Sequence, residues 1–184
     1  VEAQVSVYVP PTFKSAPEPF VDPLDPRNYP PGTVGIIAQE IARFTSFAHC
    51  MYAVMANLPP GSGEHTQCGS DICENMNMIC RTHAEHGGDW LWVMGDDHYF
   101  PGQILLRQLA LMYEHDLDIL VPHCLKRNPG WEPVVYSHRD DDGWLHVAEL
   151  PESGLVEVYA AGSAGMLIRS RVLEEIGSPW FTPG

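Results

Sequence analysis

Residues 90–122 constrain the fold more than any other part of the chain. Residues 90–94 (WLWVM) form a short, continuous apolar run, which is the pattern of a strand covered on both faces. Leu105, Leu109 and Met112 recur at helical spacing, and residues 118–122 (DILVP) indicate a second buried strand. A strand, a helix and another strand in this order predict an α/β sheet.

Asp96, Asp97 and His98 follow the first apolar run directly. Open α/β sheets bind ligands outside the carboxyl ends of their strands, and carboxylate and imidazole groups suit a divalent cation, so these residues are candidate metal ligands. If the chain stays extended, residues 96 and 98 point to one side and Asp97 to the other, which leaves two competing ligand sets. The alternative is a solvated turn in which an Asp caps a helix ahead of Pro101.

The same strand and helix patterns continue on both sides of this segment. We expect a strand over 34–38, a helix over 45–57, a polar loop over 61–70, a helix over 72–86, strands over 133–136, 144–147 and 156–159, a small-residue segment over 160–168, and a last helix capped by Ser170 that runs through Ile176. The predicted fold class is α/β, a mostly parallel sheet flanked by helices with a small antiparallel β portion toward the C-terminus.

The first 33 residues hold eight of the 17 prolines, so they cannot form a long helix or a central strand. We expect residues 1–33 to be a Pro-rich arm in which residues 5–9 could add an edge strand and residues 17–31 form a polyproline-like strap. The predicted globular domain covers residues 34–184.

Ten Lys and Arg against 24 Asp and Glu give a formal charge of −14, which would repel a nucleic-acid backbone. Bulk nucleic acid is therefore not an expected partner, and a bound cation is the most economical way to hold an anionic nucleotide. No run of 18 apolar residues is present, so no membrane span is predicted, and the first residues lack the pattern of a signal peptide.

The five cysteines show no paired CxxC spacing, which indicates reduced thiols and a cytoplasmic location. A zinc site is a weaker alternative, because structural zinc sites usually show two tight ligand pairs. The acidic triplet 140–142 is interpreted as a hairpin turn rather than a second metal site, because Asp-Gly between apolar segments is a strong turn signal. The candidate zinc ligands are His65, Cys68, Cys73, Cys80, His83 and His86.

The order of these motifs resembles that of nucleotide-sugar-dependent glycosyltransferases of the GT-A fold, close to the family 2 type. Those enzymes begin with a buried strand and a helix, continue through a helix that carries an Asn, and reach an apolar strand that ends in an Asp-rich metal motif. The resemblance spans about residues 34 to 181. The matching segments are 34–38, 45–57, Asn75 or Asn77, 95–101, 126–129, 161–168, 172–177 and 180–181.

The resemblance implies a metal-dependent transfer of a sugar from a nucleoside diphosphate sugar, a UDP- or GDP-sugar, to a hydroxyl of a glycan, lipid, protein or small molecule. It implies Mn²⁺ or Mg²⁺ held by Asp97, with Asp96 and His98, against the diphosphate. Arg43 as a surface ion pair and the two Asn as helix-face polar residues are the alternatives. The implied nucleotide-sugar-binding residues are Ala38, Gln39, Glu40, Arg43, Asn75, Asn77, Asp96, Gly162 and Ser163.

Two departures from the family pattern matter for the chemistry. Gly95 stands where the family often has a third acid. The catalytic base of the family comes from an acidic pair after the Trp-Phe element, so here it is expected either beyond Gly184 or from elsewhere. A catalytically silent nucleotide- or carbohydrate-binding module is therefore an alternative function. A nucleotidyltransferase is another, although residues 39–43 lack the glycines of a phosphate loop. One of Trp131, Trp144 and Trp180 could stack on a sugar ring.

Overall fold

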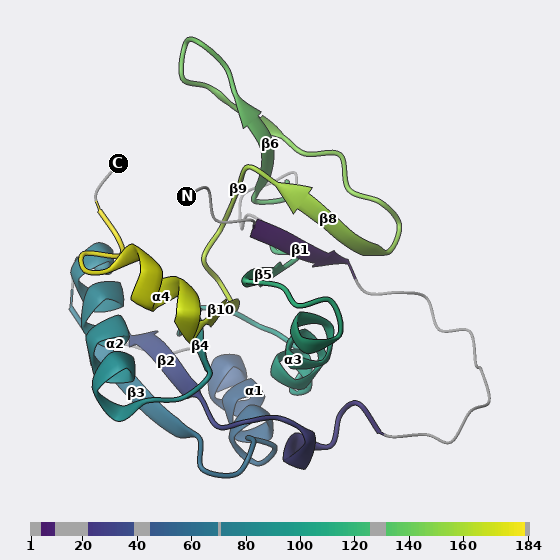
Figure 1. Cartoon of the computed structure of the whole chain (residues 1–184). Helices are drawn as coiled ribbons and strands as arrows, with labels where there is room; N and C mark the ends of the chain where they lie inside the picture. Colours follow the sequence, from purple (N-terminus) through teal and green to yellow (C-terminus); the bar gives the residue numbers. More distant parts are fainter. Residues whose placement is uncertain (1–4, 10–21, 39–44, 70, 126–131, 183–184) are drawn as a thin grey trace.

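The computed structural model describes residues 5–9, 22–38, 45–69, 71–125 and 132–182. These residues form a seven-stranded sheet in the order β3-β2-β4-β10-β5-β1-β8, a three-stranded sheet in the order β7-β6-β9, and four α-helices (Figure 1). In chain order the elements are β1 Val5–Val9, η1 Pro26–Asn28, β2 Thr33–Ala38, α1 Thr45–Met55, β3 Gly63–Cys68, α2 Ile72–His86, β4 Trp90–Gly95, α3 Ile104–Glu114, β5 Ile119–Pro122, β6 Val135–Arg139, β7 Leu145–Val147, β8 Gly154–Val158, β9 Ala160–Ala161, β10 Met166–Arg169 and α4 Ser170–Ile176.

The large sheet is mixed but mostly parallel, as predicted. β2 pairs in parallel with β3 and β4, and β5 pairs in parallel with β1. β10 lies antiparallel between β4 and β5, and β8 lies antiparallel to β1. The carboxyl ends of β4 and β5 therefore meet at one edge of the sheet, and the amino end of β10 lies between them.

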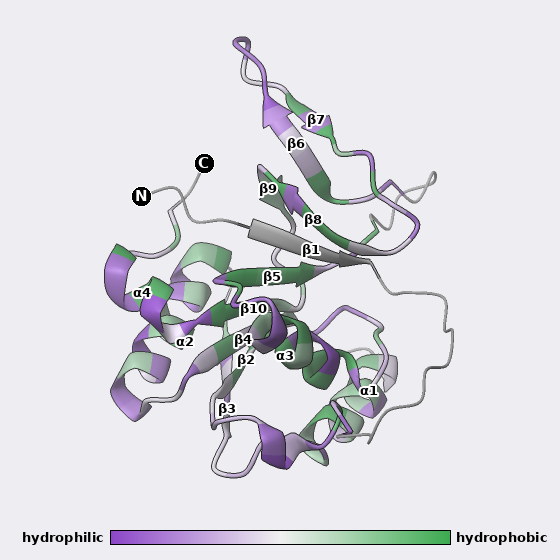
Figure 2. Cartoon of the chain, turned by 45° about the vertical axis from the view of Figure 1, so that its right-hand side comes forward, coloured by the Kyte–Doolittle hydropathy of each residue, from purple (hydrophilic) through white to green (hydrophobic). Residues whose placement is uncertain are grey.

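Helices cover both faces of the sheet because the central strands are apolar on both sides. Trp90, Trp92 and Met94 of β4 pack with α1 and α3, whereas Leu91 and Val93 pack with α2 and α4. This alternation along one strand produces the three-layered body in Figure 1. Figure 2 shows the hydrophobic residues gathered on the central strands, while the tip of the β6–β7 hairpin is hydrophilic.

β3 was not predicted, because residues 63–68 were expected to belong to a polar loop. They form a strand at the edge of the sheet, paired in parallel with β2 from Thr33↔Gly63 to Ala38↔Cys68. Every side chain of β3 is exposed or half-buried. An edge strand with little buried surface needs no apolar alternation, so hydrophobic periodicity could not identify it.

The prediction of β1 as an edge strand was wrong. Val5–Val9 lies inside the sheet, between β5 and β8. Its partners are more than a hundred residues away in sequence, and the pattern of a five-residue strand does not identify such partners. The expected strap falls partly on residues 10–21, which lie outside the described residues. Closer to β2, the indole N–H of Trp90 donates to the Pro30 carbonyl over 2.9 Å and fastens the chain to the body.

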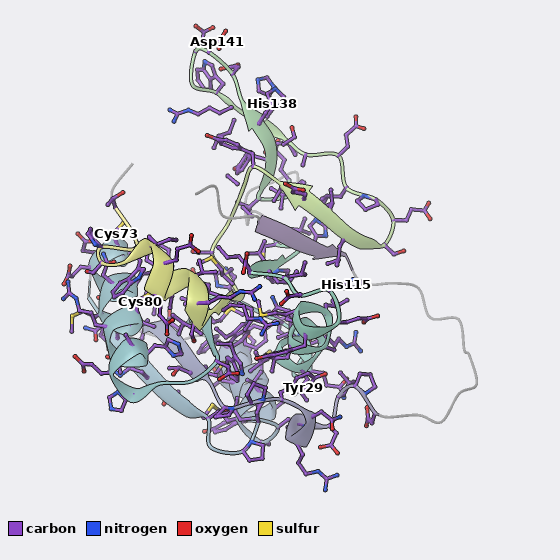
Figure 3. All side chains as sticks on the ribbon, in the orientation of Figure 1. Tyr29, Cys73, Cys80, His115, His138 and Asp141 are labelled. Atoms are coloured by element: carbon purple, nitrogen blue, oxygen red, sulfur yellow. The ribbon has the colours of Figure 1, made fainter. Side chains whose placement is uncertain are left out.

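The segment after β5 contains the predicted hairpin. β6 and β7 pair antiparallel, and the acidic triplet forms the turn between them, with the Gly143 N–H donating to the Asp140 carbonyl over 3.0 Å. His138 and Asp141 lie on this hairpin, which projects away from the main body (Figure 3). The interpretation of the triplet as a turn is therefore confirmed.

Among the described residues, no helix is both long and apolar enough to cross a membrane.

Candidate functional site

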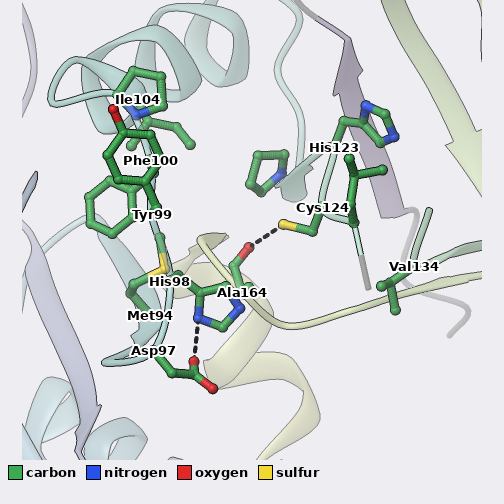
Figure 4. Close-up of a pocket in the computed structure, with 13 residues that line it drawn as sticks. Met94, Asp97, His98, Tyr99, Phe100, Ile104, His123, Cys124, Val134 and Ala164 are labelled. Atoms are coloured by element: carbon green, nitrogen blue, oxygen red, sulfur yellow. Dashed lines mark hydrogen bonds and ion pairs between the residues drawn. The ribbon is translucent and has the colours of Figure 1, made fainter. Parts of the chain in front are cut away.

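A pocket of about 660 Å³ lies outside the carboxyl ends of β4 and β5. One side is formed by residues 97–101, which follow β4, and by Ile104 at the start of α3. The other side is formed by residues 122–125, at the end of β5, and by Val134. Met94 and Ala164 complete the lining, and Figure 4 shows the two groups of side chains facing each other. This is the position at which open α/β sheets bind ligands.

Asp97 and His98 are neighbouring polar residues of the pocket lining. His98 Nδ1 lies 2.7 Å from Asp97 Oδ1 and 3.2 Å from the Gly95 carbonyl oxygen (Figure 4). Both of these neighbours are acceptors, so Nδ1 carries the proton and donates. In the neutral imidazole the lone pair is then on Nε2, which is the form in which a histidine binds a metal ion or accepts a hydrogen bond.

The backbone does not stay extended through residues 96–98. The two competing ligand sets, residues 96 and 98 or Asp97 alone, were predicted for an extended chain and therefore do not apply. β4 ends at Gly95 and residues 96 and 97 form a turn. Asp96 is only 2% exposed, does not line the pocket, and donates its backbone N–H to the Ile37 carbonyl over 3.0 Å. The turn therefore places Asp97 and His98, rather than Asp96 and His98, together at the pocket.

Neither aspartate caps α3, so the alternative of an Asp cap ahead of Pro101 is wrong. The N-cap residue is Gln103, and no side chain there accepts a capping hydrogen bond. The helix begins three residues after Pro101, with the Ile104 N–H donating to the Pro101 carbonyl over 3.0 Å. The residues between strand and helix thus form one side of the pocket instead of a helix cap.

Gly95 leaves the room that the Asp97–His98 pair occupies. A Cβ atom at position 95 would lie 3.1 Å from Asp97 Oδ1 and 3.2 Å from His98 Nδ1, which is tighter than ordinary contact. Replacing Gly95 by the third acid of the family pattern would therefore crowd the pair. The glycine at position 95, which departs from the family pattern, is therefore favoured by the positions of Asp97 and His98.

The Asp97–His98 pair has the donor chemistry of a partial site for Mn²⁺ or Mg²⁺. Within the described part of the chain, no group of three or more His, Cys, Asp or Glu side chains could hold a metal ion. Magnesium in nucleotide-binding sites commonly takes one or two protein carboxylates and completes its coordination with substrate phosphates and water. A carboxylate and an imidazole at the pocket fit a cation that arrives with a diphosphate.

The candidate zinc ligands do not come together. All five cysteines are free, and Cys80 is buried inside α2, where burial raises the pKa of its thiol to about 12. Both ring nitrogens of His83 are used by hydroxyls, Nδ1 by Thr33 Oγ1 at 2.8 Å and Nε2 by Ser170 Oγ at 2.7 Å. Ser170 therefore binds His83 rather than capping α4, whose N-cap is Arg169.

The two candidate asparagines are buried on α2 and bind backbone groups. The Asn75 amide donates to the Gly69 carbonyl over 3.0 Å and so holds the loop that follows β3. The Asn77 amide donates to the Phe181 carbonyl over 2.8 Å and accepts the N–H groups of Trp180 and Phe181 at 2.9 and 3.1 Å. Neither lines the pocket, and Asn77 instead ties the C-terminal segment to the helix.

The remaining candidates fall into three groups. Ala38 is buried at the carboxyl end of β2, on the same edge of the sheet as the pocket. The Gly162 N–H donates to the Val134 carbonyl over 2.9 Å, and Ser163 is exposed beside Ala164, so this segment adjoins the lining. Gln39, Glu40 and Arg43 lie outside the described residues.

Sequence reasoning missed the residues that follow β5. His123 and Cys124 line the pocket opposite residues 99–104. The Cys124 thiol donates to the Ala164 carbonyl over 3.4 Å, and burial raises its pKa to about 11, so it is a neutral thiol near neutral pH. Open α/β sheets bind ligands outside the carboxyl ends of their strands, which pointed to Asp97 after β4. The same rule applies to the end of β5 and could have identified His123 and Cys124 from the sequence. Trp144 and Trp180 do not line the pocket, and Trp131 is outside the described residues.

Comparison of the sequence with protein-family models gives no match, and comparison with curated proteins gives none either. The fold alone is established, an α/β body with a mixed, mostly parallel sheet and a small antiparallel sheet beside it.

Proposed function

We propose that this protein is a metal-dependent glycosyltransferase that moves a sugar from a UDP- or GDP-sugar to an acceptor hydroxyl. The observation that supports this most is the Asp97–His98 pair, which lines a pocket outside the ends of β4 and β5. The order of motifs resembles the GT-A glycosyltransferases, and the mostly parallel sheet is compatible with that resemblance.

The chain's overall charge makes a cation useful at this position. At −14 the protein repels a diphosphate at long range, and the part of the pocket lining that the structure describes contains no Lys or Arg. Asp97 would hold Mn²⁺ or Mg²⁺ through its carboxylate, and the metal when bound would supply Lewis-acid stabilisation of the departing diphosphate. His98 donates from Nδ1 to that carboxylate and orients it, and Nε2 lies on the far side of the ring from Asp97, so substitution of Asp97 removes the ligand itself.

Thermal unfolding with a panel of UDP- and GDP-sugars, with and without Mn²⁺, tests the proposal. We expect one donor in the presence of Mn²⁺ to raise the Tm by about 5 °C or more when its concentration is about a hundred times its Kd. Asp97→Ala should abolish this increase and the release of nucleoside diphosphate. Asp141→Ala is the matched control, because it removes the same charge from the exposed hairpin turn.

Stabilisation by every donor that survives both chelation and Asp97→Ala would refute the assignment of the site. The main alternative is a catalytically silent nucleotide- or carbohydrate-binding module. It differs in one measurable respect, since a pure binder would be stabilised by the donor but would release no nucleoside diphosphate over prolonged incubation with Mn²⁺ and an acceptor panel.

A further inference from the structure

We propose that the pocket beside Asp97 and His98 is an acceptor subsite for a neutral molecule with a flat, apolar aglycone, of which an aryl glycoside is the simplest example. The term acceptor rests on the proposed function, whereas the chemistry of the bound group follows from the pocket itself. The inference concerns what occupies the space between the two sides of the pocket.

The two sides of the pocket are mainly apolar. Phe100 and Ile104 face Val134 across it (Figure 4), and Pro122 and Leu125 also line the pocket. Small-molecule sites are typically apolar clefts of a few hundred cubic ångströms with a few polar groups that fix orientation, and a volume of about 660 Å³ lies in that range. A ring system can therefore be enclosed between these side chains.

Among the described residues that line the pocket, few carry polar side chains. Asp97 supplies a carboxylate, and His98 and His123 supply imidazoles. Cys124 is a neutral thiol whose hydrogen is already donated to the Ala164 carbonyl. A charged group on the aglycone would lose its hydration between the apolar side chains, so the apolar part of the pocket favours an uncharged aglycone.

A nucleobase is the other flat group that a sugar donor would bring. Its edge carries several donors and acceptors, and burying them without partners would cost free energy. The apolar sides offer few such partners, whereas an aryl or alkyl aglycone needs none. The Asp97–His98 end of the pocket is where the hydroxyls of the attached sugar would find hydrogen-bond partners.

Two exposed residues at the pocket allow a test that leaves the core intact. Tyr99 is 83% exposed and Leu125 is 47% exposed, and both line the pocket. Tyr52, 73% exposed, and Val147, 46% exposed, are matched controls that do not line it. We compare Tyr99→Ala with Tyr52→Ala, and Leu125→Ser with Val147→Ser.

The measurement is calorimetric titration of para-nitrophenyl and methyl glycosides of glucose, galactose and mannose, without donor or metal. We expect the aryl member of at least one pair to bind about tenfold more tightly than its methyl partner, because a buried ring removes apolar surface from water. Tyr99→Ala and Leu125→Ser should reduce this difference, and the two controls should preserve it.

Equal binding of the aryl and methyl partners in all three pairs would overturn the inference, as would pocket variants that bind like their controls. Displacement of the aryl glycoside by uridine or guanosine would assign the space to the donor base and would also overturn it. Because no donor is present, these titrations report on the subsite even if the chain transfers no sugar.

Discussion

At the scale of single residues, Gln108 on α3 is a fully buried polar side chain that makes three hydrogen bonds to other elements. Its Oε1 accepts the indole N–H of Trp92 at 2.9 Å, and its Nε2 donates to the carbonyls of Leu120 and Gly165 at 3.2 and 2.9 Å. One amide thus joins α3 to β4, β5 and the start of β10. Gly165 meets this network from a left-handed conformation, with φ at +69°, and a Cβ there would lie 3.0 Å from Pro122 Cγ.

We predict that Gln108→Leu lowers the free energy of unfolding by about 3 kcal/mol, because it leaves the Trp92 N–H without its acceptor inside the core. Urea denaturation followed by tryptophan fluorescence measures this loss. Gln103→Leu is the control, since Gln103 is exposed and makes no capping bond at the start of the same helix. Equal losses from the two substitutions would show that the Gln108 hydrogen bonds contribute no more to the free energy of unfolding than the exposed Gln103 side chain does.

At the scale of elements, His83 joins β2, α2 and α4. Ser170 Oγ donates to the Gly88 carbonyl over 2.6 Å, so it accepts from His83 Nε2, and Nδ1 accepts from Thr33 Oγ1. Burial lowers the pKa of His83 below its ordinary value of 6.5, which favours this neutral form of the ring. Because the unfolded chain binds a proton on this residue more readily than the folded chain, acid favours unfolding.

The stability contributed by neutral His83 is complete above pH 6.5 and is lost as the pH falls toward the lowered pKa. We predict that the wild type loses about 1 kcal/mol more than His83→Gln between pH 7.5 and pH 5.5. Urea denaturation of both proteins at the two pH values gives this difference. His86→Gln serves as the control, because His86 is exposed on the same helix, and it should lose as much stability as the wild type.

The elements that could be predicted from the sequence are those whose burial leaves a period in the chain. The apolar run of β4 and the helical spacing of α3 specify their own structure, and the predicted range 72–86 is the observed range of α2. β3 is polar and half-exposed at an edge, and the partners of β1 are set by distant residues, so neither follows from local pattern.

At the scale of the whole molecule, the position of the candidate site follows from topology, whereas its composition does not. Ligands of open α/β sheets bind outside the carboxyl ends of the strands, and Asp97 does line a pocket there, because β4 and β5 end at the same edge. The rule could not show that the chain turns at Asp96 and buries it, nor that Asn75 and Asn77 bind backbone. The placement of Asp96 and Asn77 depends on contacts with segments far apart in sequence, and that of Asn75 on the loop six residues before it.

The net charge of −14 gives a prediction that concerns no single site. Repulsion among surface carboxylates opposes the compact state, and salt screens it. We predict that raising KCl from about 0.02 M to about 0.5 M increases the free energy of unfolding by about 1 kcal/mol at pH 7.5. Asp141→Asn with Asp142→Asn, both exposed in the hairpin turn, changes the charge from −14 to −12 and should weaken this dependence.

Measurements at acidic pH separate the repulsion among surface carboxylates from the contribution of buried His83. Protonation of exposed histidines lowers the net negative charge and relieves repulsion, whereas protonation of His83 disrupts a buried contact. In high salt the repulsion is already screened, so the acid loss assigned to His83 should stay or grow, and in low salt it should be partly offset. Stability that is independent of salt at pH 7.5 would show that the carboxylates lie too far apart to repel one another.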